Sequence, residues 1–391
     1  MHIFQLWREY KLSIAELLHV FPRGKIVYHN EEVLVLKSLK RNDVLEKAKT
    51  FWGTIKIMEV LEIESFEDHV IESAARKEWK FKYGISTFWK RQNLKSILNT
   101  LKWELRDNDL SSRYVNKEFA NLSSAQIIWE NLIDSESDFN IVDTWKDLLY
   151  WVTIWVQDIE TYAQRDYGKK RDMIVGMLPP KLCQMMINIS RNTKSKSEDI
   201  VVYDPFVWLG TLLIESLYMG NTKVYGSDLN ENMVKATRTN LGNIKKENVK
   251  DFQFDLININ AKDIWNSKIL KSNRVDAIVS EWYLWEMMTR KNISLERIEA
   301  QSDVLSPLYE EFFAWLQNLN YKGSIVISFP FWEMNGKYFY SEGIYDTLNK
   351  YCQIQELFPP YMDIEPTKTG SLFYKRDKQM VGREIFKLKM K

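Results

Sequence analysis

The sequence predicts an α/β protein whose C-terminal part is a doubly wound, mainly parallel sheet, preceded by an α+β region. From about residue 160 on, strand-like apolar runs alternate with helix-like segments, which is typical of a parallel sheet with helices on both faces. Before that point, strand-like and helix-like segments are mixed without this regular alternation. The 391 residues suffice for two or three domains, each with its own core.

The N-terminal region is expected to contain two α+β parts, residues 1–60 and 61–135. The polar and acidic stretch 134–145 predicts a linker, which we place at 136–160. Helix-like patterns cover residues 13–18, 94–105 and the start at 125–128, and strand-like patterns cover residues 25–28, 33–36, 80–86 and 112–115.

The C-terminal region, residues 161–391, is expected to form a single domain. Its last strand-like segments, 372–374 and 384–388, predict a closing antiparallel pair. The parallel strands are expected at residues 200–203, 223–226, 252–254, 275–279 and 324–329, and the helices between them at 212–219, 232–241 and 307–319.

The composition excludes several classes of protein. No apolar run approaches the roughly 20 residues that span a bilayer, and the first residues lack the pattern of a signal peptide. Two cysteines, Cys183 and Cys352, provide neither a disulfide framework nor a metal cluster, so we expect a cytoplasmic protein without a metal. All four histidines lie within the first 70 residues, which excludes Ser-His-Asp chemistry and the usual zinc sites from the C-terminal half.

Carboxylates follow successive strands of the predicted parallel sheet, where ligands of such sheets bind. Asp204 ends the first strand, and Asp228 follows the second at a spacing near the roughly 20 residues expected of a ribose-binding carboxylate. Asp263 follows the third strand and is placed to accept from an adenine amine; Glu281 ends the fourth. Taken alone, Asp228 is as readily explained as a helix cap as by ribose binding, and Asp263 is more often a cap or turn residue. Glu281 taken alone is explained as an exposed residue. Together they favour a nucleoside cofactor, and the absence of G-x-G-x-x-G argues against a dinucleotide.

Several segments resemble the THUMP-containing tRNA guanine-N2 methyltransferases, which carry a Rossmann-like, class I S-adenosylmethionine (SAM) domain. Residues 157–188 are similar to the segment that opens this domain. Asp204-Pro-Phe-Val-Trp-Leu-Gly-Thr211 resembles the first SAM motif, and Ser227-Asp-Leu-Asn through Asn240-Leu241 resembles the second. Tyr83-Gly-Ile-Ser86 and Leu122-Ser-Ser-Ala-Gln126 resemble the THUMP module. The likeness extends over nearly the whole chain.

The resemblance implies SAM as cofactor and assigns roles along the predicted turn. Lys181 would border the methionine end, although a helix start after Pro179-Pro180 explains this segment equally well. The residues expected to bind SAM are Asp204, Phe206, Trp208, Gly210, Thr211, Asp228, Leu229, Asp263 and Lys181.

The turn after the fourth strand departs from the family pattern Asp/Asn-Pro-Pro-Phe/Tyr. Here it is Glu281-Trp-Tyr-Leu-Trp285, without the second proline and with the aromatic residue one position early. By resemblance, Glu281 is expected to accept from the target exocyclic amine, guanine N2 being the favoured target. Tyr283 is expected to stack on the base.

A basic block at residues 80–117 interleaves with aromatic residues, as nucleic-acid surfaces do. A solvated helix face is the alternative, and the THUMP resemblance favours a tRNA partner. We expect the protein to be a monomer. The residues expected to contact RNA are Lys82, Lys90, Arg91, Lys95 and Arg113.

Tryptophan is frequent and glycine is scarce. The chain has 15 Trp and 14 Gly, and together they reach about the 7% that glycine alone usually contributes. We therefore hypothesise that many of the codons written here as tryptophan are UGA, which the source organism reads as glycine. The alternative is a set of true tryptophans in the core and on an RNA surface; UGG codons at 208, 282 and 285 would establish it. The tryptophans that stand where glycine is expected are Trp7, Trp52, Trp151, Trp155, Trp208, Trp282 and Trp285.

Two other functions remain open. One is a DNA amino-methyltransferase. The other is a non-catalytic RNA-binding protein whose SAM site is blocked by Trp208.

Overall fold

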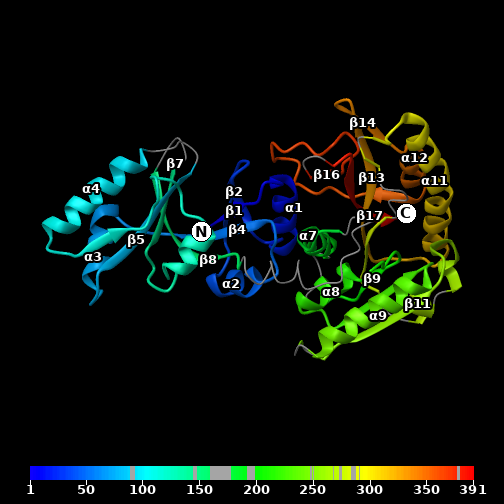
Figure 1. Cartoon of the computed structure of the whole chain (residues 1–391), viewed down its shortest axis with the longest axis horizontal. Helices are drawn as coiled ribbons and strands as arrows, with labels where there is room; N and C mark the ends of the chain where they lie inside the picture. Colours follow the sequence, from blue (N-terminus) through cyan, green and yellow to red (C-terminus); the bar gives the residue numbers. More distant parts are fainter. Residues whose placement is uncertain are drawn as a thin grey trace. The chain divides into compact units, whose positions relative to one another are not determined.

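The computed structural model divides the chain into two compact units (Figure 1). The N-terminal unit comprises Met1–Ile14, Arg23–Lys49 and Gly53–Tyr167, and the C-terminal unit comprises Ala15–Pro22, Thr50–Trp52 and Gly168–Lys391. The structure describes residues 1–391 except 89–92, 144–147, 159–177, 192–198, 247–248, 250, 267, 273–274, 283–287, 290 and 377–378.

The N-terminal unit is built on one mixed sheet. Its pairs are antiparallel except for β5, which runs parallel to both β6 and β7. In spatial order the described strands are β2 (Lys25–His29), β3 (Val33–Lys37), β1 (His2–Leu6), β4 (Thr54–Val60), β8 (Leu148–Val156), β7 (Asp138–Asp143), β5 (Phe81–Phe88) and β6 (Ser112–Tyr114).

Helices α3 and α4 cover the end of this sheet that contains β5 and β7. In α4 (Leu94–Asp107), Leu94, Leu98, Leu101 and Leu105 are buried at helical spacing. They share a core with Phe66, Val70 and Ala74 of α3 (Phe66–Ala75) and with Phe139 of β7. The unit also contains α2 (Arg41–Ala48), α5 (Ser124–Trp129) and part of α1 (Tyr10–Val20).

The region expected as a linker, residues 136–160, differs from that expectation. It contains β7 and β8, which pair with each other and with β5 and β4 at the middle of the sheet. The polar residues before Asp138 indicated a loop. The apolar run Leu148–Val156, however, is typical of a strand covered on both faces.

The C-terminal unit confirms the predicted α/β fold, a Rossmann-like sheet with a closing antiparallel strand. The spatial order is β11 (Gln253–Asn258), β10 (Lys223–Asp228), β9 (Val202–Asp204), β12 (Ala277–Glu281), β13 (Ser324–Met334), β17 (Val381–Met390) and β15 (Cys352–Ile354). The strands from β11 to β13 pair in parallel, and β17 is antiparallel to both of its neighbours. Strand order reverses between β9 and β12, so the ligand-binding switch point lies there.

Helices and short strands complete this unit. Aromatic side chains of α11 (Leu295–Asn318) pack on Ile278, Ile325 and Phe329 of the sheet. The remaining described elements are α7 (Pro180–Ser190), α8 (Thr211–Tyr218), α9 (Glu231–Lys246), the 3-10 helix η1 (Ala261–Asn266), α10 (Lys268–Ser272), β14 (Lys337–Tyr340), α12 (Glu342–Tyr351) and β16 (Leu372–Tyr374). Among the described residues, no helix combines the length and apolar character needed to cross a membrane.

Candidate functional site

A pocket of about 410 Å³ opens in the C-terminal unit at the carboxyl ends of β9, β10 and β12. This volume is in the range of small-molecule sites. The turn from β9 to α8 forms one wall, and Leu229 and Ala261 contribute apolar surface. Three carboxylates, Asp204, Asp228 and Glu281, line the same pocket. The predicted strand-end acids therefore do converge, with the exception of Asp263.

Hydrogen bonds hold the β9–α8 turn in place. Asp204 Oδ1 accepts from the backbone N–H of Phe206 at 3.1 Å and from the Ser280 hydroxyl at 2.6 Å. The N–H of Trp208 donates to Asp228 Oδ2 at 3.0 Å, which ties the turn to the end of β10. Gly210 precedes α8 with a φ of 79°. The amino end of α8 thus adjoins a pocket wall made by Thr211.

Burial makes these carboxylates hard to ionise. It raises the pKa of Asp204 to about 7, opposed by the hydrogen bonds from Ser280 and Phe206 and reinforced by the charges of Asp228 and Glu281. Burial also raises the pKa of Asp228, against hydrogen bonds from the backbone of Asn230 and Trp208. Perturbed carboxyl groups lining one pocket mark a candidate functional site, and they favour a cationic ligand.

Asp228 both stabilises a turn and lines the pocket. Its Oδ1 accepts from the N–H of Asn230 at 2.9 Å, and its Oδ2 accepts from Trp208. Each carboxylate oxygen has a second lone pair, so ribose hydroxyls remain possible donors to it. Leu229, also expected at the cofactor, lines the pocket and is 68% exposed.

Three expected cofactor residues, Gly210, Asp263 and Lys181, do not line the pocket. Asp263 lies in η1 and its N–H donates to the carbonyl of Asn260, while Asn260 and Ala261 supply the wall instead. The ammonium of Lys181 lies 4.5 Å from the ring centroid of Trp52. Leu178, three residues earlier, is the pocket residue of that segment.

An ion pair that the sequence did not indicate stands at the end of β12. The Nε–H of Arg383, on β17, donates to Glu281 Oε1 at 2.6 Å, and the two side chains are 6% and 16% exposed. Burial raises the pKa of Glu281, and the Arg383 charge opposes that rise. Tyr283, the second expected catalytic residue, and Trp285 lie outside the described residues.

Trp208 and Trp282 line the pocket, the first with an unusual backbone conformation and the second with an indole N–H unsatisfied by any residue that the structure describes. Trp208 has a φ of 48°, a left-handed conformation that bulky residues rarely adopt. Trp282 is 0% exposed and packs against Phe206 and Tyr309 at centroid distances of 4.7 and 4.5 Å. Its indole N–H finds no hydrogen-bond acceptor among the described residues, although buried Trp N–H groups usually have one.

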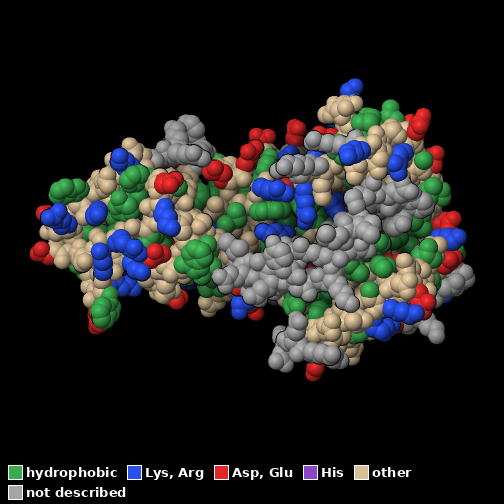
Figure 2. Space-filling model, in the orientation of Figure 1, with side chains coloured by type: hydrophobic (Ala, Val, Ile, Leu, Met, Phe, Trp, Pro, Cys, Tyr) green, Lys and Arg blue, Asp and Glu red, His purple; other side chains and the backbone are tan. Residues whose placement is uncertain are grey.

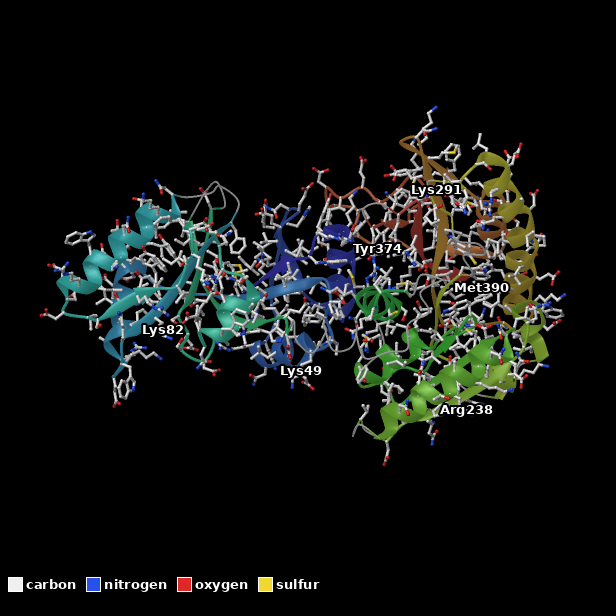
Figure 3. The ribbon with its side chains drawn as sticks, in the orientation of Figure 1. Lys49, Lys82, Arg238, Lys291, Tyr374 and Met390 are labelled. Atoms are coloured by element: carbon white, nitrogen blue, oxygen red, sulfur yellow. The ribbon has the colours of Figure 1, made fainter. Side chains whose placement is uncertain are left out.

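The expected RNA-binding residues lie in the N-terminal unit. Figure 2 shows Lys and Arg side chains gathered on this unit, around the place where Figure 3 labels Lys82. Lys82 and Arg113 both bond to Glu130, at 3.0 and 2.9 Å. The Lys95 ammonium lies 5.4 Å from the ring of Phe119. Lys90 and Arg91 are outside the described residues.

No group of three His, Cys, Asp or Glu side chains within the described part of the chain is arranged to hold a metal ion.

Comparison with known proteins finds one short sequence likeness. No protein-family model matches the chain. Over 64 residues it is 41% identical to the tRNA (guanine(10)-N2)-dimethyltransferase of Pyrococcus abyssi, strain GE5 / Orsay. The match covers 16% of this chain and 17% of that protein, so it spans about a sixth of the relative's length.

Solved structures with partial likeness include three proteins described as methyltransferases. The chain is 13% identical to a ribosomal protein L11 methylase of Lactobacillus delbrueckii subsp. bulgaricus, covering 54% of this chain and 77% of that one with a TM-score of 0.31. It is 11% identical to a SAM-dependent O-methyltransferase of Thermotoga maritima, covering 64% of this chain and 77% of that one with a TM-score of 0.32. It is 14% identical to a methyltransferase homolog of Pyrococcus horikoshii, covering 49% of this chain and 61% of that one with a TM-score of 0.34. These are partial overlaps, and the fold assignment rests on the strand order of this chain itself.

Proposed function

We propose that this chain is a SAM-dependent methyltransferase that acts on tRNA, at a base exocyclic amine and most directly at guanine N2. The observation that carries the proposal is the convergence of Asp204, Asp228 and Glu281 on one pocket at the switch point of the sheet. A nucleoside cofactor with positive charges suits both the acidity and the size of this pocket.

The described residues fit the adenosyl part of SAM. The lone pairs left on Asp228 can accept from ribose hydroxyls, and Leu229 and Ala261 provide apolar surface for a base. Burial raises the pKa of Asp204 to about 7, and the cationic methionine part beside it would favour its ionised form. When bound, SAM supplies an electrophilic methyl group. The chain's own contribution is to bind, orient and desolvate the reactants, which accounts for much of such a rate enhancement.

Two features support tRNA as the substrate. The relative that matches over 64 residues is named a tRNA guanine-N2 dimethyltransferase. The N-terminal unit, for which we propose a THUMP-like role, carries Lys82, Lys95 and Arg113, and it also exposes Trp79 and Trp129. Cations with aromatic rings can contact phosphates and stack on unpaired bases.

One observation favours a second candidate function. Trp208 lies in the wall of the pocket, and an indole at this turn occupies space that a cofactor would need. A protein that binds tRNA without binding SAM is therefore the alternative.

Titration calorimetry with SAM, followed by mass analysis of nucleosides from tRNA incubated with SAM, tests the proposal. We expect SAM binding and a methylated guanosine. Retained tRNA binding without SAM binding would identify a non-catalytic RNA-binding protein whose SAM site is blocked by Trp208. Methylation of DNA but not of tRNA would identify a DNA amino-methyltransferase.

A further inference from the structure

We propose that Arg383 is a positioning residue that holds Glu281 as a fixed carboxylate anion, with one oxygen directed to an exocyclic amine of the substrate. This inference rests on the proposed function and extends it to a residue near the end of the chain. Arg383 does not line the pocket, so it acts through Glu281.

The strand register brings the pair together. Glu281 pairs with Ser328 of β13, and Arg383 of β17 pairs with Pro330, two residues further along β13. Paired residues of neighbouring strands share a face, and so do residues two apart on one strand. Glu281 and Arg383 therefore lie on the same face of the sheet, although 102 residues separate them in the chain.

The contact engages one of the two carboxylate oxygens. The guanidinium donates to Oε1 at 2.6 Å, a short, charge-assisted bond. Within the described part of the chain, Oε2 has no hydrogen-bond partner, while Glu281 lines the pocket. One oxygen is thus held by the protein, and the other can accept from a ligand N–H.

The burial of Glu281 explains why it needs a cation. Asp204 and Asp228 line the same pocket, and burial of Glu281 disfavours its charged form. A buried carboxyl without a partner becomes neutral. Arg383 provides that partner at short range, and Arg376, whose Nε–H donates to the Tyr374 hydroxyl at 3.2 Å, adds a second positive charge. Among the described residues, Arg383 and Arg376 are the charged groups that act on the pKa of Glu281, and both lower it.

A fixed anion at this place suits amine chemistry. As the amine nitrogen bonds to the methyl carbon, the carbon–sulfur bond of the sulfonium breaks and its electron pair returns to sulfur. The nitrogen becomes more positive until it releases a proton to solvent, and a carboxylate already oriented toward its N–H stabilises that charge without reorganisation. A neutral Glu281 would accept the same hydrogen bond more weakly. The pair thus offers a physical substitute for the Asp/Asn-Pro-Pro turn that this chain lacks.

The test is the pH dependence of kcat for methyl transfer to tRNA. In Arg383→Gln we expect the acidic limb of the profile to move up by about one to three pH units, the usual effect of an adjacent opposite charge on a carboxyl. Arg383→Lys should restore most of the wild-type limb. In the double variant Arg383→Gln/Glu281→Gln, kcat should be no lower than in Glu281→Gln, because residues acting as a unit are not additive.

Arg238→Gln is the matched control, since Arg238 lies on α9, away from Tyr374 and the β17 side of the unit (Figure 3). An unmoved limb in Arg383→Gln, or equal profiles for the Lys and Gln variants, would overturn the inference.

A stability measurement keeps this inference separate from the proposed function. If wild-type protein methylates nothing, the proposed function fails, and the pair is then tested by urea unfolding. Loss of Arg383 further raises the pKa of Glu281 in the folded state, so its ionisation opposes folding more. The stability deficit of Arg383→Gln should grow as pH rises from 5 to 8. A deficit that does not change with pH would reject the electrostatic role.

Discussion

At position 208 the backbone adopts a conformation that its side chain disfavours. Trp208 has a φ of 48° and Gly210 a φ of 79°, so two left-handed residues stand two positions apart in the turn. Such a conformation costs a non-glycine residue about 1–2 kcal/mol. The N–H of Trp208 bonds to Asp228, and its carbonyl accepts from the Thr237 hydroxyl at 2.7 Å. These bonds hold the turn in a shape suited to Gly-x-Gly.

Trp208→Gly is therefore expected to improve SAM binding. The change relieves the backbone strain and opens the pocket wall, and we expect the Kd for SAM to fall at least about tenfold, equivalent to 1.4 kcal/mol. Titration calorimetry measures it. Trp79→Gly, which removes an 85% exposed indole from the N-terminal unit, is the control. Unchanged or weaker binding by Trp208→Gly would contradict both this expectation and the glycine hypothesis for this codon.

Asp204 is expected to make stability depend on pH. Since burial raises its pKa to about 7, the folded protein keeps this proton at pH values where the unfolded chain has lost it. Its ionisation thus opposes folding, and stability should decline as pH rises from about 4, the unfolded pKa, through about 7.

Urea unfolding at pH 5, 6, 7 and 8 checks this, and Asp204→Asn should flatten the decline. The amide oxygen of Asn can still accept from Ser280. Asp255→Asn, on the exposed side of β11, should leave the slope unchanged. Equal slopes for Asp204→Asn and wild type would show that another group is responsible.

At the scale of single elements, helix α4 shows how much periodicity determines. The sequence predicts a helix from Leu94 to Leu105, and the structure has one at Leu94–Asp107. Its start is capped by the Asn93 side chain, which accepts from the N–H of Ser96 at 3.2 Å. Local pattern and capping suffice for this element because both act within one helical turn.

Truncation of the buried stripe of α4 should destabilise the N-terminal unit. Leu101 is 1% exposed, so Leu101→Ala should lower the free energy of unfolding by about 2–5 kcal/mol. Asn99→Ala, at an exposed position of the same helix, should change it by less than about 0.5 kcal/mol. Urea unfolding monitored by circular dichroism measures both. Equal losses of unfolding free energy in the two variants would mean that the buried leucines of α4 do not stabilise the unit by packing.

The bounds of other elements could not be predicted from local sequence patterns. Helix α11 begins at Leu295, twelve residues before Pro307, where the sequence pattern predicts its start. A proline is typical of a first helical turn, yet here the surrounding core holds the helix through it. Tyr309 and Phe312 of this helix pack on Trp282, which offsets the hydrogen bond that proline cannot make.

At the scale of the whole molecule, the net charge of +1 conceals a local basic surface. Neutralising several phosphates makes binding salt-dependent, with a slope that scales with the number of contacts. Lys82 and Arg113 share Glu130, and ion pairs between exposed groups are weak. Phosphates can therefore compete with Glu130 for both cations.

The triple variant Lys82→Ala/Lys95→Ala/Arg113→Ala is expected to bind tRNA more weakly. The slope of log affinity against log salt should become shallower by about two to three, while SAM binding stays the same. Lys235→Ala/Lys350→Ala/Lys389→Ala, three exposed positions of the C-terminal unit, serves as the charge-matched control. If both triple variants lose tRNA affinity equally, the basic surface of the N-terminal unit is not the specific contact.

By itself, the sequence determined the alternation of strands and helices, and with it the carboxyl edge where Asp204, Asp228 and Glu281 meet. It could do so because side-chain periodicity is local and parallel strands end at one edge. Only the tertiary structure decided that Arg383 faces Glu281, because β17 enters the sheet antiparallel beside β13 and brings distant residues onto one face. It likewise placed β7 and β8 inside a sheet where composition indicated a linker, because pairing in a sheet depends on the strands alongside.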